Sequence, residues 1–180
     1  EFNRSQDNDF RKSFKNLNEG LYPTHPYGTQ TTIGEGEHLK NPSMVNIHQY
    51  FNDYYQPNNI AICLSGDLDP DKTIELIEKY FGDWENAAIP QKQIPEQEPI
   101  EEPIIKTAYG TQPEHLYIGF RFDEAGSKEA MMMRLVSGVL RNGSAGLIDL
   151  DLLQKQKVLK AASYESFMND YSSHMLFGMP

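Results

Sequence analysis

The sequence predicts an α+β fold in which helices pack on one face of a mainly antiparallel sheet. Three observations support this prediction: amphipathic helical stretches, short strand-like runs that are most frequent in the second half, and a proline-rich segment between the halves. The order of helices and strands on either side of that segment favours helices layered on a sheet.

The first half of the chain contains three helix signals. Residues 4–22 carry Phe10, Phe14, Leu17 and Leu21 at helical spacing, which indicates one amphipathic surface helix. Residues 21–40 are rich in Gly, Thr and Pro and are expected to form a long loop. Asn41-Pro42 and Asp69-Pro70 each combine a capping side chain with a proline at the first helical position, so each should start a helix. The second of these helices should end at Gly82.

A strand is expected between these last two helices. Residues 59–66 form a continuous apolar run of strand length between turn residues, which is typical of a strand covered on both faces. Cys63 lies in the middle of this run, so we expect a buried, unreactive thiol. As the only cysteine of the chain, it can form neither an internal disulfide nor a thiolate-rich metal site.

The second half begins after a linker. Ala87–Pro103 contains four prolines among Gln and Glu, a composition that favours extended, semi-rigid backbone. Beyond it, residues 127–141 are strongly helical and residues 147–156 suggest a short helix. Strands are expected at 104–109, 115–122, 159–168 and 172–179.

Composition and charge exclude several function classes. The 180 residues include 38% hydrophobic side chains, too many for a disordered acidic tail. A net charge of −10 disfavours binding to nucleic acids and anionic membranes, which would repel the chain. No apolar run approaches the ~20 residues that span a bilayer, so we expect no membrane insertion. The compartment stays open, with the periplasm as one candidate.

No self-contained active site is apparent. None of the five histidines lies three or four residues from another, the spacing that would place two imidazoles on one helical face. No Gly-x-Ser-x-Gly nucleophile motif occurs. The glycines around Glu35 and Glu37 make a poor phosphate loop because the two carboxylates repel an anion. We therefore expect no catalytic residue and no cofactor-binding residue in this chain.

Several motifs together resemble the insulinase/pitrilysin family of zinc metallopeptidases, which includes proteins like the mitochondrial processing peptidase. They are Tyr22-Pro23-Thr24-His25-Pro26-Tyr27-Gly28, Gln49-Tyr50-Phe51, Leu64-Ser65-Gly66-Asp67, Lys79-Tyr80-Phe81-Gly82, His115-Leu116-Tyr117-Ile118-Gly119-Phe120-Arg121 and Gly143-Ser144-Ala145-Gly146. They occur in the family's order over most of the chain. The resemblance implies α+β units that enclose a chamber for peptide substrates.

The resemblance also implies where the zinc chemistry lies. The family's inverted His-x-x-Glu-His motif supplies two zinc ligands and a general base, and a second glutamate downstream completes the site. This motif is absent here and would lie upstream of Glu1, so the chain corresponds to the segment after it. By position, Glu1 could be the downstream zinc ligand. The competing interpretation is a solvent-exposed terminal residue.

One part of the family pattern is missing. Active members often carry an Arg and, seven residues later, a Tyr that bind the substrate carbonyl, and the matching positions here are Gln154 and Ala161. Neither can donate to an oxyanion as a guanidinium or phenol does. In long members with four units this pair belongs to the later half, whereas in two-unit members its absence would indicate a non-catalytic subunit.

These observations lead to one main hypothesis about function. The chain would be a fragment of a zinc-dependent metalloendopeptidase that forms part of the chamber wall and supports peptide binding without being catalytic. The start without Met and the end within an extended apolar stretch also indicate a piece of a larger protein. The alternative is a non-catalytic subunit or peptide-binding module of the same architecture, and an unrelated acidic α+β domain is a third possibility.

The hypothesis fixes domain limits and partners. Residues 1–86 would be the C-terminal part of a first peptidase-like unit, 87–103 a linker, and 104–180 the N-terminal part of a second, non-catalytic unit. Zinc is expected in the parent protein and no metal in this segment alone. The expected partners are a peptide or small-protein substrate and other units of the same chain, with no nucleic acid.

Overall fold

The computed structural model describes residues 1–180 and divides them into two compact units. One unit, here called the sheet unit, comprises Glu1–Ile33 and Pro95–Pro180. The other, here called the helical unit, comprises Gly34–Ile94. Each unit is described by itself.

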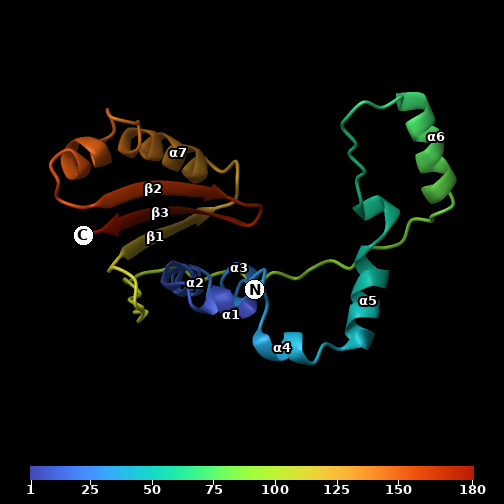
Figure 1. Cartoon of the computed structure of the whole chain (residues 1–180), viewed down its shortest axis with the longest axis horizontal. Helices are drawn as coiled ribbons and strands as arrows, with labels where there is room; N and C mark the ends of the chain where they lie inside the picture. Colours follow the sequence, from blue (N-terminus) through green and yellow to red (C-terminus); the bar gives the residue numbers. More distant parts are fainter. The chain divides into compact units, whose positions relative to one another are not determined.

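The centre of the sheet unit is a three-stranded antiparallel sheet (Figure 1). Its strands are β1 Leu116–Asp123, β2 Lys160–Phe167 and β3 Tyr171–Met179, in the order β1-β3-β2. All three strands were predicted, the first of them from its alternating apolar face. The α+β class with an antiparallel sheet is therefore confirmed.

One face of this sheet carries helix α7, Lys128–Leu140. The helix begins as predicted, because the Ser127 hydroxyl accepts a hydrogen bond from the Ala130 backbone N–H at 3.1 Å. A π-helical segment, Asp149–Leu153, follows where a short helix was expected. Helix α7 packs on β2 and also contacts β1 and β3, which defines what we call the α7 face of the sheet.

Three N-terminal helices lie on the opposite side of the sheet (Figure 1). They are α1 Phe2–Gln6, α2 Asp9–Leu21 and α3 Pro26–Thr29. The single helix predicted over residues 4–22 is interrupted because the Asn8 side chain accepts from the Arg11 backbone N–H at 3.0 Å and starts a new helix there. Helix α2 approaches β1 at Gly119, where an added Cβ would lie 2.8 Å from a Leu17 methyl group. We call this side the open face.

The helical unit contains α4 Gly36–Lys40, α5 Met44–Tyr54, a 3₁₀ turn at Pro57–Asn59, and α6 Pro70–Phe81. Helix α6 begins as predicted, with the Asp69 carboxylate accepting from the Lys72 backbone N–H at 3.3 Å and Pro70 at the first position. Gly82 follows its last residue, also as predicted. The start of α5 was predicted two residues too early, because Ser43 rather than Asn41 provides the cap.

Two predicted strands are wrong. Residues 59–66 and 104–109 belong to no strand. A strand needs a partner with which its backbone forms hydrogen bonds, and neither segment has one within the described chain. The segment 104–109 instead lies alongside α2, where Lys106 forms an ion pair with Glu19 at 2.7 Å. Cys63 is consequently exposed, so the prediction of a buried thiol is also wrong.

Part of the proline-rich linker is held to the sheet unit around Gln97. The side chain of Gln97 is buried, and its amide donates to the Thr24 hydroxyl at 2.6 Å and accepts from the Thr24 backbone N–H at 3.3 Å. Its backbone N–H donates to the Tyr171 hydroxyl at 3.0 Å. The Arg121 guanidinium donates to the carbonyls of Leu21, Gln97 and Glu98. These bonds tie the linker to both the N-terminal loop and the sheet.

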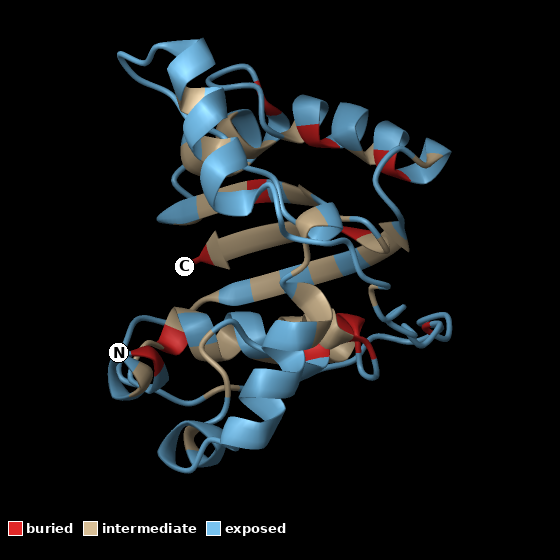
Figure 2. Ribbon diagram, turned by 90° about the vertical axis from the view of Figure 1, so that its right-hand side faces the viewer, coloured by how far each residue is buried: buried red, intermediate tan, exposed pale blue.

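Few apolar side chains are fully buried within the chain. Figure 2 shows short buried stretches in a ribbon that is mostly exposed or intermediate. The buried hydrophobic residues are Leu21, Tyr22, Ala130 and Met179, all of the sheet unit. In the helical unit, large side chains such as Val45 and Tyr80 are at least 70% exposed. None of the helices has the length and apolar character needed to cross a membrane.

Candidate functional site

Glu1 does not form part of a metal centre made by this chain. Its side chain is 70% exposed, and one carboxylate oxygen accepts from the Arg4 guanidinium at 2.7 Å. The structure contains no group of three His, Cys, Asp or Glu side chains that could hold a metal ion. Because structural and catalytic zinc sites need at least three protein ligands, Glu1 could contribute only one ligand to a larger site.

His25 has a structural environment. The ring is fully buried, and its Nδ1 accepts from the Tyr27 backbone N–H at 3.1 Å. The proton therefore lies on Nε2, which is 3.4 Å from an Asp170 carboxylate oxygen. The Tyr27 hydroxyl donates to the same oxygen at 3.1 Å. These contacts join the loop after α2 to the turn between β2 and β3.

A buried polar network links α7 to the sheet. The Ser137 hydroxyl lies 2.5 Å from the Glu165 carboxylate and 3.3 Å from the Ser163 hydroxyl, which is 2.7 Å from Nε2 of His174. A carboxylate only accepts, so the Ser137 proton points toward Glu165. The Ser163 proton must then point toward Ser137, and His174 must carry a proton on Nε2. The directions of these hydrogen bonds thus assign the tautomer of His174, with the proton on Nε2.

Three members of this network are shielded from water. Ser137, Ser163 and His174 are each at most 2% exposed, so none of them is accessible to a substrate. Burial lowers the pKa of the His174 imidazole below its ordinary value of 6.5, and the nearby Glu165 carboxylate opposes that shift. The Arg141 guanidinium lies 4.0 Å from the other Glu165 oxygen. The network serves to attach the helix to the sheet.

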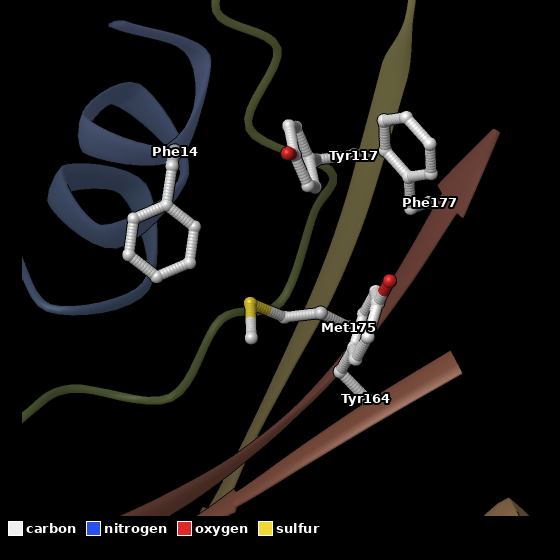
Figure 3. Close-up of a pocket in the computed structure, with 5 residues that line it drawn as sticks. All are labelled: Phe14, Tyr117, Tyr164, Met175 and Phe177. Carbon is white, nitrogen blue, oxygen red and sulfur yellow. The ribbon is translucent and has the colours of Figure 1, made fainter. Parts of the chain in front are cut away.

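The open face of the sheet carries an aromatic pocket (Figure 3). Its volume is about 370 Å³, and it is lined by Phe14 of α2, Tyr117 of β1, Tyr164 of β2, and Met175 and Phe177 of β3. Figure 3 shows Phe14 and Met175 pointing toward the same space from the helix and the strand. No charged side chain lines the pocket.

The strand register explains why a hollow exists there. Tyr117, Phe177 and Ala162 form one row across the open face, and Gly119, Met175 and Tyr164 form the next. Each row combines two large side chains with one small residue, so the sheet surface is uneven. Helix α2 fills the space above Gly119 but leaves the side of the face nearer β2 uncovered.

The pocket combines apolar walls with two phenol groups. Tyr117 contacts Phe177 with ring centroids 5.2 Å apart and meets Phe14 edge-on at 6.4 Å. Burial raises the pKa of Tyr117, and the neighbouring Tyr164 phenol raises it further. Neither hydroxyl bonds to another group of the chain, so both can donate to a ligand.

Gln154 and Ala161 lie outside this pocket. The Gln154 amide donates to the Asp149 carboxylate at 2.5 Å and to the Ser144 carbonyl at 3.3 Å, which are local contacts of the π-helical segment. Ala161 pairs with Gly178 on the α7 face of the sheet. The two positions therefore provide no oxyanion donor on the open face.

The sequence did not single out the pocket residues. In β1 the predicted apolar face contains Leu116, Ile118 and Phe120, whereas Tyr117 points to the other side. An aromatic residue on the supposedly polar side of a strand was the available signal. Phe14 was predicted only as part of the apolar stripe of the first helix and Tyr164 gave no signal, because they join the pocket only through the packing of α2 and the hairpin register.

A family model and a curated protein both match most of the chain. Residues 45–179 match the family described as "Peptidase M16 inactive domain". Among curated proteins, the chain is 25% identical over 161 residues to the zinc protease PqqE of Helicobacter pylori, covering 87% of this chain and 36% of that protein. The chain thus spans little more than a third of this relative.

Solved structures share the fold. A protease from Helicobacter pylori superposes with a TM-score of 0.73 at 22% identity, covering 98% of this chain and 44% of that one. The ferredoxin protease FusC, solved in complex with Arabidopsis ferredoxin, gives a TM-score of 0.64 at 16% identity over 98% of this chain and 20% of that one. Because the family match covers most of its residues, the chain belongs to the peptidase M16 inactive-domain family.

Proposed function

We propose that this chain is the non-catalytic part of a longer zinc-dependent endopeptidase, here called the parent protein. Membership in the M16 inactive-domain family is the observation that carries the proposal. The match covers only 36% of the length of PqqE, which supports a parent protein longer than this chain. In this proposal residues 1–86 end a first peptidase-like unit, 87–103 connect it to the next, and 104–180 begin a second unit that is not catalytic.

The role of the chain is to form part of the wall of a substrate chamber. The open face supports this role, because its pocket offers apolar surface without any catalytic group. The parent acts on peptides or small proteins, and the complex of FusC with ferredoxin supports a protein substrate for this class of enzyme. Zinc would be bound by the parent, with Glu1 as one ligand, and when bound it would supply Lewis-acid activation of the scissile carbonyl and of water.

Glu1 supplies one of the zinc ligands of the parent. Its carboxylate is exposed and held only by Arg4, so it can turn toward a metal ion bound by residues elsewhere in the parent. A surface ion pair of this kind contributes little to stability, so its loss costs the fold little.

The test measures the zinc content of the purified parent protein and of two variants. Glu1→Gln should lower the zinc content of the parent several-fold and abolish peptide hydrolysis. Glu37→Gln is the matched control, because Glu37 forms an equally exposed ion pair three residues from Lys40, at 2.8 Å. It should retain full zinc. An equal zinc content in both variants would show that Glu1 is not a zinc ligand. Zinc-dependent hydrolysis by this chain alone would refute its non-catalytic role.

A further inference from the structure

We infer that the aromatic pocket of the open face binds one large apolar side chain, such as Phe or Leu, of an extended peptide that is neutral or positively charged. This inference rests on the proposed function, because it identifies what the chamber wall recognises. The inference concerns a pocket for peptide recognition, which lies on the sheet and needs no metal ion to bind its ligand.

The exposure of the lining residues gives the driving force. Phe14 is 42% exposed and Tyr164 is 45% exposed, although both face the hollow. An apolar side chain that enters the hollow removes this surface, and its own, from water. Met175 has a flexible thioether that adapts to side chains of different shape. The pocket should therefore select for size and apolarity rather than for one particular residue.

The volume limits what can enter. Pockets for small molecules measure roughly 300–1,000 Å³, so 370 Å³ lies at the lower end of that range. It suits one side chain rather than a folded segment. The rest of the peptide must lie outside, where the hydroxyls of Tyr117 and Tyr164 can donate to its backbone carbonyls.

Charge and size argue against a second copy of the chain as the occupant. The net charge of −10 makes two copies repel one another, and it favours a neutral or cationic peptide. A stable protein dimer also buries roughly 800 Å² on each partner, far more than this pocket offers. Peptide binding is thus the better explanation for an uncharged pocket on an acidic chain.

The experiment compares two lysine-containing, otherwise Gly/Ser-rich peptides that differ only in one central residue, Phe or Ala. Binding to the chain and to the parent protein is followed through the ¹³C-methyl resonance of Met175, assigned with Met175→Leu. The Phe peptide should shift this resonance with an affinity at least tenfold higher than that of the Ala peptide. This comparison needs no variant of the pocket walls.

Two variants locate the effect. Tyr164→Ala should weaken binding of the Phe peptide by about tenfold, because Tyr164 is the one β2 side chain that lines the pocket. Tyr80→Ala truncates an exposed tyrosine of α6 in the helical unit and should leave binding unchanged. Circular dichroism of each variant checks that it is folded. Equal loss in both variants would overturn the inference.

Other occupants give different results. A Met175 shift that follows protein dilution alone would indicate self-association, and a parent in which Met175 never responds to either peptide would indicate that the parent's own residues fill the pocket. Either result overturns the inference. Zinc plays no part in the assay, so peptide binding by a parent without zinc or peptidase activity would keep the pocket and reject the proposed function.

Discussion

At the scale of single residues, His174 shows how the sheet unit uses polar side chains in its interior. Hydrogen counting places its proton on Nε2, directed at Ser163, in a chain that ends at Glu165. A network of this kind is stable only while every member has its partner, because an unsatisfied buried polar group is costly. Burial, which lowers the pKa of His174, favours the neutral imidazole with its proton on Nε2.

The pH dependence of stability follows from this arrangement. The pKa of His174 is lowered in the folded chain, so below about pH 6.5 the unfolded chain binds more protons and the free energy of unfolding falls as pH decreases. The loss is at most about 1.4 kcal/mol per pH unit for one proton. His174→Gln keeps an N–H donor for Ser163 but does not titrate, so the decrease between pH 7 and pH 5 should become shallower.

Urea denaturation at a series of pH values measures this effect. His38→Gln is the matched control, since His38 is exposed in α4, and it should retain the slope of the original chain. An unchanged slope in His174→Gln would show that folding does not lower the pKa of His174.

The same scale shows what sequence reasoning can and cannot predict. Asp69-Pro70 predicted the start of α6 correctly, because a cap acts on backbone groups only three residues away. The exposure of Cys63 was not predictable in that way, since it depends on whether distant strands cover residues 59–66. The Ser163–His174 contact likewise depends on how β2 and β3 pair.

At the scale of elements, the junction between α2 and α3 depends on close backbone contact. Gly28 of α3 is buried, and a Cβ at this position would collide with the backbone carbonyl oxygens of Tyr22 and Asn18. Only a residue without a side chain permits this approach. The Tyr-Gly ending of the motif at residues 22–28 therefore has a packing reason that does not involve substrate.

A pair of glycine substitutions tests this packing. Gly28→Ala should lower the free energy of unfolding by about 1–3 kcal/mol, because a carbonyl oxygen of the backbone cannot move aside as a side chain can. Gly138→Ala in α7 is the control: its Cβ would meet nothing within 4 Å, and it should be neutral or stabilise by up to about 1 kcal/mol. Both values come from urea denaturation, and a Gly28→Ala variant as stable as the original would contradict the packing argument.

The elements also differ in how far local patterns determine them. The predictions of β1, β2 and β3 were confirmed because each of these strands finds a partner within the sheet unit. The run at residues 59–66 has an equally good strand pattern but no partner in the described chain, so it stays unpaired. Strand propensity reports a surface that suits a sheet, and the sheet itself must be supplied by other segments.

At the scale of the whole molecule, the two faces of the sheet have different roles. The α7 face is tied to its helix by the Ser137 and His174 network, whereas the open face keeps an aromatic pocket beside α2. The fold class and the family were predictable from the sequence because they depend on motifs along the chain. The pocket was not, because its five lining residues come from four separate elements.

In this proposal the sheet of the chain helps to bind the peptide, and apart from the zinc ligand Glu1 no side chain of the chain takes part in bond cleavage. Steady-state hydrolysis of an unstructured Phe-containing peptide should therefore be compared between the parent protein and its Tyr164→Ala variant. We expect the variant to have a KM about tenfold higher with kcat within twofold of the original, because the lost contact exists in both the ground state and the transition state. A fall in kcat at unchanged KM, or no change in either constant, would contradict it.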